Sequence, residues 1–173
     1  APLENRFPGQ ESFKGRIFHT ARWPREALEL SDKRVGVVGI GATGIQVIQT
    51  IADQVGELKV FIRTPQYVLP MKNPKYGDKE VQAYHNRFEE LRGRLPTTFT
   101  GFEHDFDHVW ADLTPAQRLA VLEDIYADGS LKLWLASFAE MFFDEAVSEE
   151  ISEFVRGKMR ARLKDKRLQE LLI

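Results

Sequence analysis

The sequence predicts an α/β fold in which one βαβ unit is followed by a long α-helical part. Residues 35–38 form a short β-branched run that stops at a glycine-rich turn. Residues 43–55 then repeat apolar side chains at helical spacing, and a second β-branched run follows over 58–62. After Pro65 no strand pattern resumes, and the chain is predicted to be helical from residue 78 onward.

The composition and charge exclude several classes of function. A net charge of −2 over 173 residues argues against a surface whose main role is to bind nucleic acid or an anionic membrane. No apolar run approaches the roughly 20 residues that a membrane span requires. The absence of cysteine excludes disulfides, thiolate catalysis and cysteine-based metal sites. We therefore expect a cytoplasmic protein without a metal ion, and the start at Ala1 instead of Met suggests a piece cut from a longer chain.

The βαβ unit is indicated by a sharp change after an irregular N-terminal stretch rich in proline and glycine. Residues 35–38 end at Gly39, as a buried parallel strand does. The helix over 43–55 is expected to stop at Gly56, a common residue at the C-terminal end of helices. The second strand covers 58–62, and a helical crossover between two strands implies that they pair in parallel.

Five helices are expected in the remainder of the chain. The first runs from about residue 79 to 94. The second has the clearest start, because Thr114 is suited to the N-cap, Pro115 to the first helical position and Gln117 to the capping box. This second helix is expected to end near Gly129.

The other three helices are predicted from apolar stripes. The third carries apolar residues on one face: Leu131, Trp134, Leu135, Phe138, Met141 and Phe142. The fourth carries a longer stripe: Val147, Ile151, Phe154, Val155, Met159 and Leu163. A short last helix is expected over 166–172. The aromatic residues of the third helix are interpreted as core instead of cofactor contacts.

The glycine turn is the strongest functional signal. In the pattern G-x-G-x-x-G, Gly39 permits a tight turn, Gly41 lets the backbone approach a pyrophosphate, and Gly44 allows close packing of strand and helix. The helix N-terminus adds free N–H groups and the positive end of its dipole. The sequence therefore predicts part of a Rossmann-type dinucleotide site. The candidate cofactor-binding residues of the turn are Gly39, Ile40, Gly41, Ala42, Thr43, Gly44, Ile45 and Gln46.

The end of the second strand indicates which dinucleotide binds. The ribose-reading position lies about 20 residues after the turn, where an acid would accept the 2′-hydroxyl of NAD. This sequence has Arg63 and Thr64 there and no acid. Because a guanidinium and a hydroxyl suit a 2′-phosphate, we predict NADPH instead of NADH or FAD at this turn. The alternative is that Arg63 is merely an exposed strand-end residue.

Upstream of the turn, residues 13–24 read FKGRIFHTARWP and fit neither helical nor strand periodicity. This stretch resembles the fingerprint F-x-G-x-x-x-H-x-x-x-W-P of the type I Baeyer–Villiger monooxygenases, in the cyclic-ketone monooxygenase group. The downstream FIRTPQYVLP and the helical stretch 78–173 also resemble that family. The fixed fingerprint positions are Phe13, Gly15, His19, Trp23 and Pro24.

The resemblance implies an FAD-dependent enzyme that uses NADPH and O2 to convert a ketone into an ester or a lactone. It implies an interdomain linker with the fingerprint over 1–34, an NADPH-binding Rossmann βαβ part over 35–72 and a helical insertion over 73–173. The implied partners are the ketone, O2 and the FAD-binding domain of the same parent chain. The fingerprint is then a conformational element between domains.

Parts of the family machinery do not occur in this sequence. The FAD-binding glycine turn of the family precedes the fingerprint, and residues 1–12 contain no such turn. The active-site arginine of the family follows an F-G-x-K pattern, which is also absent. We therefore expect no catalytic residue here, with NADPH bound in part and FAD mainly by other parts of the chain. The alternatives are an N-hydroxylating or general flavin-containing monooxygenase, or a stand-alone NADP-binding module without catalysis.

The histidines and the basic run suggest three other kinds of chemistry at first sight: proton transfer, metal binding and nucleic-acid binding. We expect His19 to orient the backbone instead of transferring a proton, because no carboxylate or nucleophile has a matching spacing to it. His104 and His108 lie in an irregular loop, which disfavours a metal site that also involves His85. The basic run over 156–167 is interpreted as a solvated helix face and end, not as a nucleic-acid site.

Overall fold

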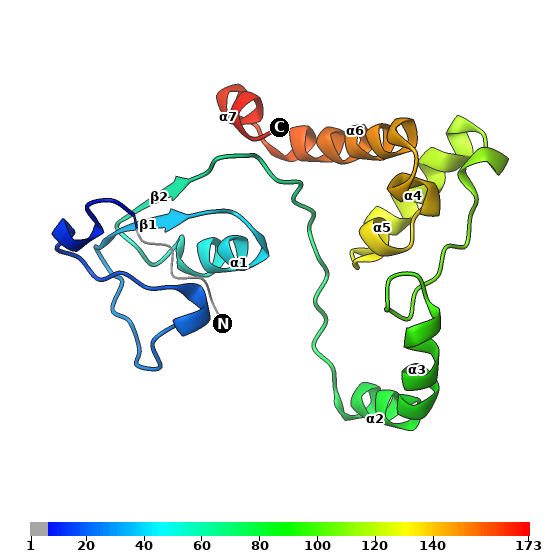
Figure 1. The fold of residues 1–173 in the computed structure, drawn as a ribbon, viewed down its shortest axis with the longest axis horizontal. Coiled ribbons are helices and arrows are strands. Elements are labelled where there is room, and N and C mark those ends of the chain that lie inside the picture. Colours follow the sequence, from blue (N-terminus) through cyan, green and yellow to red (C-terminus); the bar gives the residue numbers. More distant parts are fainter. Residues whose placement is uncertain (1–6) are drawn as a thin grey trace. The chain divides into compact units, whose positions relative to one another are not determined.

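The computed structural model describes residues 7–173 (Figure 1). The chain divides into two compact units, one that ends at Gln66 and one that covers Tyr67–Ile173. The first contains a two-stranded parallel sheet with one helix, and the second is helical. The predicted boundaries between linker and βαβ part, after residue 34, and between βαβ part and helical insertion, after residue 72, stay predictions. None of the helices between residues 7 and 173 is long and apolar enough to cross a bilayer.

The first unit contains the predicted parallel βαβ arrangement. Strand β1 covers Arg34–Val38, helix α1 covers Ala42–Ile51, and strand β2 covers Glu57–Phe61. The two strands pair in parallel, with Arg34 opposite Glu57 and Val38 opposite Phe61. Before β1, the described chain is irregular except for two short 3₁₀ turns, η1 (Gln10–Ser12) and η2 (Thr20–Arg22).

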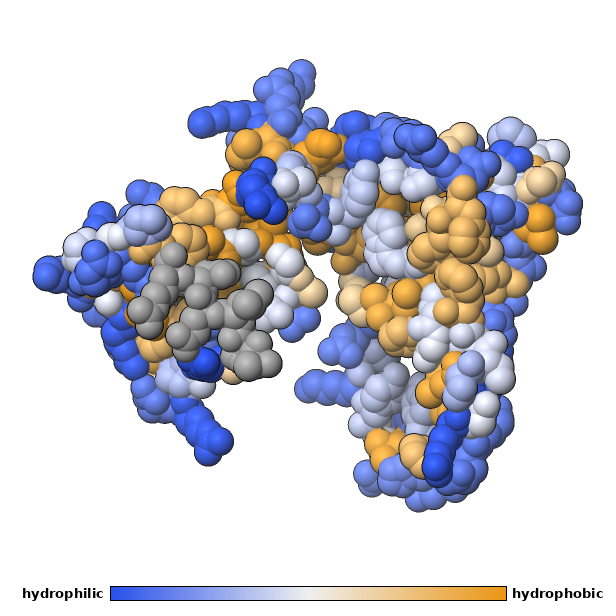
Figure 2. Space-filling view, in the orientation of Figure 1, coloured by the Kyte–Doolittle hydropathy of each residue, from blue (hydrophilic) through white to orange (hydrophobic). Residues whose placement is uncertain are grey.

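Among the described residues, one face of this small sheet is covered and the other is largely exposed. Val35, Val37 and Leu58 are half-buried on the side of α1, whose Ile51 is buried. On the other face Val38 is 68% exposed and Phe61 is 57% exposed. Figure 2 shows apolar residues, in orange, exposed at the surface among hydrophilic ones, in blue. This second face therefore presents an exposed apolar patch within the described part of the chain.

Helix α1 ends at Ile51, earlier than the predicted Val55, so the role assigned to Gly56 was wrong. The residues after Ile51 form turns that lead into β2. Gly56 is needed for a different reason, because a Cβ there would lie 2.9 Å from the backbone of Asp32. Asp32 itself has a positive φ of 59°. Gly56 therefore permits close approach of two backbone turns, and it does not cap the helix.

The second unit contains six helices and three 3₁₀ turns. The second predicted helix is confirmed: the hydroxyl of Thr114 accepts from the N–H of Gln117, and Gly129 follows with a φ of 70°. The turns are η3 (Leu95–Thr97), η4 (Trp110–Asp112) and η5 (Ala139–Phe142). The helices are α2 (Asp78–Asn86), α3 (Phe88–Arg94), α4 (Pro115–Asp128), α5 (Lys132–Leu135), α6 (Glu145–Arg162) and α7 (Lys166–Leu172).

Two predicted helices are wrong in extent. The helix expected over 79–94 is interrupted at Arg87, whose dihedral angles of −99° and 3° lie outside the α-helical range. The third helix stops after Leu135, and Phe138 is extended with φ −141° and ψ 129°. The extended backbone directs the Phe138 ring against Trp110, with centroids 4.8 Å apart and planes nearly perpendicular. Tertiary packing of this ring overrides the local helical pattern.

The core of the second unit forms around α6. Val147, Ile151, Val155 and Met159 are buried on one face of α6, which confirms four positions of the predicted stripe. Phe154 is only half-buried, and Leu163 follows the end of the helix. Phe138 is fully buried. The buried cluster is completed by Trp110, Leu122 and Leu133.

The basic run over 156–167 covers the last turns of α6 and the start of α7. Its basic residues from Arg160 onward are exposed as predicted, but Arg156 and Lys158 are half-buried. Three of its side chains are paired within the unit: Lys158 with Glu123 at 2.6 Å, Arg160 with Glu153 at 2.6 Å, and Arg156 with Glu153 at 2.7 Å. These pairs use carboxylates of the same unit to balance part of the positive charge.

Candidate functional site

The glycine turn between β1 and α1 has three positions with different steric requirements. Gly39 has a φ of 94°, in the region that favours glycine, and its N–H donates to the carbonyl of Phe61 at 2.9 Å. A Cβ on Gly44 would lie 2.4 Å from the carbonyl oxygen of Gly39. A Cβ on Gly41 would meet nothing within 4 Å. The turn therefore has no room for a side chain at Gly44, where strand and helix meet, but has free space beside Gly41. We call these the closed and the open side of the turn.

The N-terminus of α1 presents unpaired donors at this open side. The first backbone bond of the helix runs from the N–H of Ile45 to the carbonyl of Gly41, 3.0 Å. Among residues 7–173, no group accepts from the N–H groups of Ala42, Thr43 and Gly44. The first turn carries no acidic side chain, and its N-cap is a glycine. These donors and the helix dipole favour an anion at this position.

The other turn residues predicted to contact a cofactor differ in exposure. Ala42, Thr43 and Gln46 are exposed, whereas Ile40 and Ile45 are half-buried. The apolar pair is therefore partly withdrawn from solvent, and the exposed three lie at the surface near the free N–H groups.

Parallel pairing places the end of β2 at the same sheet edge as the glycine turn. Val38, the last residue of β1, is opposite Phe61, the last residue of β2. Arg63 and Thr64 follow directly and are exposed. Within the described part of the chain, the guanidinium of Arg63 has neither an ion pair nor a hydrogen bond, and so it is available to an external anion.

The fingerprint stretch forms a locally ordered segment on the first unit. His19 caps η2, because its Nδ1 accepts from the N–H of Ala21 at 3.1 Å. A Cβ on Gly15 would lie 2.6 Å from the ring of Phe13, an exposed side chain that can turn aside. Trp23 lies 6.0 Å from the ring of Phe18. These contacts support the predicted backbone-orienting role of His19, which remains a prediction, as do the roles of the other fingerprint positions.

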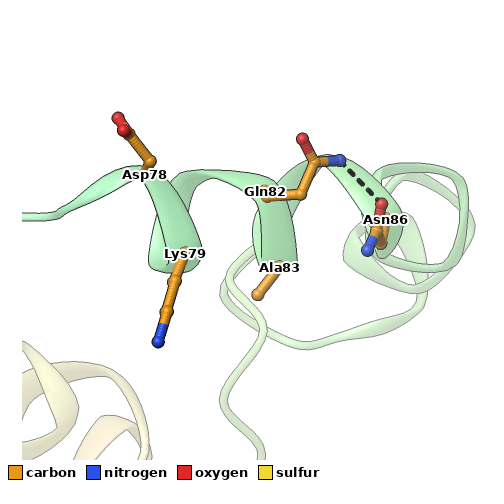
Figure 3. A pocket seen from close by; sticks show the side chains of 5 residues that line it. All are labelled: Asp78, Lys79, Gln82, Ala83 and Asn86. Atoms are coloured by element: carbon orange, nitrogen blue, oxygen red, sulfur yellow. Dashed lines mark hydrogen bonds between the residues drawn. The ribbon is translucent and has the colours of Figure 1, made fainter.

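Two surface hollows of the second unit differ in their linings. The one along α2 is lined by Asp78, Lys79, Gln82, Ala83 and Asn86 (Figure 3). Its side chains point in different directions, and Gln82 donates to Asn86 at 2.9 Å. The other is lined mainly by ionisable side chains: Arg94, Glu103, His104, Asp105, Asp107, His108, Asp124 and Lys132. Between residues 7 and 173, no group of three or more histidine, aspartate or glutamate residues is arranged to hold a metal ion.

Sequence reasoning missed the contacts of Tyr67, Lys72 and Arg156. Arg156 donates to the hydroxyl of Tyr67 at 2.8 Å, across 89 positions of sequence. The N–H of Lys72 donates to the carbonyl of Gly129 at 2.8 Å. No local sequence pattern predicts these pairs, because each joins residues far apart in the sequence that meet only when the chain packs against α4 and α6.

Comparison with known proteins defines the class. The family model of flavin-binding monooxygenase-like proteins matches residues 1–130, and the chain belongs to this family.

Among curated relatives, the chain is 67% identical over 173 residues to acetone monooxygenase (methyl acetate-forming) of Gordonia sp. (strain TY-5). It is 34% identical to cyclopentanone 1,2-monooxygenase of Comamonas sp. (strain NCIMB 9872). The matches cover 100% and 99% of this chain, but only 32% of either relative. The chain thus spans about a third of these proteins.

The fold matches a solved structure of the same kind. The crystal structure of OTEMO in complex with FAD and NADP has a TM-score of 0.92 and 32% identity, and the match covers 100% of this chain and 34% of that one. The resemblance to Baeyer–Villiger monooxygenases that the fingerprint indicated is confirmed by these relatives.

Proposed function

We propose that this chain is the NADPH-binding segment of an FAD-dependent Baeyer–Villiger monooxygenase. In that reaction one atom of O2 enters the ketone to give an ester or lactone, the other leaves as water, and NADPH becomes NADP⁺. The observation that carries the proposal is the glycine turn with free helix N–H groups, found downstream of the fingerprint stretch. The βαβ unit is then the first part of a Rossmann-type domain that is completed elsewhere in the parent chain.

The described residues fit the dinucleotide well. The N–H groups of Ala42, Thr43 and Gly44 would hold the pyrophosphate, and the space beside Gly41 admits it. Arg63 and Thr64 would hold the 2′-phosphate. When bound, NADPH supplies the hydride that reduces the flavin. The contribution of this segment is to bind and orient the dinucleotide, because it supplies no second glycine turn for FAD and no catalytic side chain.

The substrate follows from the relatives only as a class. The parent protein is proposed to oxidise ketones, with small linear ketones first, because identity to the acetone monooxygenase is 67% and to the cyclopentanone enzyme 34%. The FAD-binding domain of the parent chain is the proposed partner of this segment. The open apolar face with Val38 and Phe61 is suited to contact further parts of that chain.

Activity of the full-length protein tests the proposal. With NADPH, O2 and a panel of acetone, cyclopentanone and cyclohexanone, we expect an ester or lactone in proportion to NADPH consumed, most rapidly from acetone. The products are identified by gas chromatography with mass spectrometry. Oxygenation of an amine but of no ketone would favour an N-hydroxylating enzyme. NADP binding without any oxygenated product would favour the non-catalytic module.

Replacing Arg63 by alanine tests the predicted cofactor preference. Loss of one charge-assisted contact costs about 1.5–3 kcal/mol, so NADPH should bind roughly 10- to 150-fold more weakly, whereas NADH binding should change little. Dissociation constants of the full-length protein for both nucleotides measure this. Lys59→Ala is the matched control, because Lys59 lies within β2 and pairs with Glu57 at 3.2 Å. Equal losses for NADPH and NADH would remove Arg63 from the 2′-phosphate.

A further inference from the structure

The N-cap of the short turn η2 is a histidine. Nδ1 of His19 accepts from the backbone N–H of Ala21 at 3.1 Å. The N–H of Arg22 closes the same turn by donating to the carbonyl of His19 at 2.8 Å. In the sequence the turn lies between Phe18 and Trp23, whose ring centroids are 6.0 Å apart. The histidine cap therefore fixes the backbone between these two rings.

The direction of this hydrogen bond determines the protonation state of the His19 ring. A backbone N–H can only donate, so Nδ1 must present a lone pair, and the proton of the neutral ring is then on Nε2. A protonated imidazole has an N–H on both nitrogens and cannot accept at Nδ1. The cap is therefore compatible with the neutral form of His19 and incompatible with the charged form.

The other side chains that cap an N-terminus between residues 7 and 173 differ from His19 in this respect. They are Thr114 at α4, Asp144 at α6 and Asp165 at α7. A hydroxyl keeps its acceptor lone pairs, and a carboxyl group keeps acceptor capacity in both of its protonation states. Among these four caps, only that of η2 therefore uses an acceptor that a proton abolishes.

The described surroundings of His19 offer no replacement for the lost bond. His19 is exposed, so a proton reaches it from solvent. Among residues 7–173 no carboxylate forms an ion pair with it, and Glu26 is paired with Arg16 at 2.8 Å. The charged side chains nearest to it in the sequence are the cations Arg16 and Arg22. An imidazolium at position 19 therefore loses its bond to the turn without gaining an opposite charge from these residues.

We propose that His19 is a pH-sensitive cap of the fingerprint stretch. Histidine is the side chain whose charge ordinarily changes between about pH 5 and 8. At the upper end of this range Nδ1 holds the turn. As the pH falls, a proton takes the lone pair of Nδ1, the bond from Ala21 breaks and the turn loosens. This inference goes beyond the proposed function, because it concerns a local switch that does not depend on which nucleotide binds.

Hydrogen exchange of the full-length protein tests the switch. Exchange of single amides is followed by mass spectrometry after rapid mixing, and each rate is corrected for the intrinsic pH dependence of amide exchange. We expect protection of the Ala21 amide to fall roughly 2- to 30-fold between about pH 8 and about pH 5.5, the effect of losing an N-cap. The amide of Gly39, which donates to the carbonyl of Phe61 at 2.9 Å, is the internal reference and should keep its protection.

Two substitutions at position 19 separate the cap from other effects of pH. His19→Asn keeps a side-chain acceptor that does not titrate, and asparagine is among the preferred N-caps. Protection of the Ala21 amide should then be equal at both pH values. His19→Ala removes the acceptor, so protection should be low at both. His85→Asn is the matched control, because His85 is an exposed histidine on α2, and this variant should respond to pH like the unchanged protein.

Three results would overturn the inference. Protection of the Ala21 amide that does not change with pH in the unchanged protein would show that protonation leaves the cap intact. An equal loss in His19→Asn would assign the response to another titrating group. A parallel loss at Gly39 would show a general loosening of the first unit instead of a local switch. NADPH titration is independent of these readouts, so failure of this inference is distinguishable from failure of the proposed function.

Discussion

Replacing Gly44 by alanine is expected to destabilise the first unit and to abolish tight NADPH binding. The new Cβ would lie 2.4 Å from the carbonyl oxygen of Gly39, a backbone atom that cannot turn aside as a side chain can. Overpacking of this kind typically costs about 1–3 kcal/mol. Strand β1 and helix α1 must move apart to relieve this overlap. The N–H groups at the start of α1 then no longer point toward the position of the pyrophosphate. Thermal unfolding of the full-length protein and NADPH titration measure the two losses.

Gly41→Ala is the matched control for this prediction. Gly41 has a φ of −63°, which alanine adopts readily, and its Cβ would meet no protein atom within 4 Å. The variant should fold with nearly unchanged stability yet bind NADPH more weakly, because the methyl group occupies the space assigned to the pyrophosphate. If Gly41→Ala binds NADPH normally, the dinucleotide does not lie against this turn. If Gly44→Ala is as stable as the unchanged protein, the packing argument fails.

Truncation of Phe138 to alanine should give the largest loss of stability in the second unit. The Phe138 side chain is fully buried and contacts the Trp110 ring edge-on. Large-to-small changes of a buried phenylalanine cost about 3–5 kcal/mol, since apolar contacts are lost and a cavity remains. Urea denaturation followed by far-ultraviolet circular dichroism reports the change, because the second unit is mainly helical.

Phe143→Ala provides the comparison for this core prediction. Phe143 is 76% exposed and lies 5.9 Å from the Phe99 ring in an aromatic cluster at the surface. Its truncation is expected to change the free energy of unfolding by no more than about 0.5 kcal/mol. Similar losses for Phe138→Ala and Phe143→Ala would show that burial does not decide the stability of this unit.

Much of the fold could be predicted where the local signal is complete. The parallel βαβ unit follows from two β-branched runs around a helical period, and the start of α4 follows from Thr114, Pro115 and Gln117. The buried stripe of α6 follows from regular apolar spacing over many turns. In each case the residues that form the element are close together in sequence. The interactions that stabilise the element can therefore be read from the local pattern.

The errors fall where long-range packing determines the backbone. Phe138 has the spacing of a helical stripe, yet it is extended because its ring packs against Trp110. The break at Arg87 has no marker in the apolar pattern. Gly56 resembles a helix stop, but it is required by the approach of Asp32. A pattern along the chain does not show which distant surface a side chain will meet.

The sequence by itself determined the family and the candidate site. The fingerprint and the glycine turn are short motifs, and Arg63 is a single residue at a defined position after the turn. In each case the residue types and their spacing are enough to predict the chemistry. Only the tertiary structure decided that the turn is open at Gly41 and closed at Gly44, and that Arg156 of α6 donates to the hydroxyl of Tyr67. The physical reason is that steric space and hydrogen bonds between distant residues arise from packing, which exists only once the helices and strands have come together.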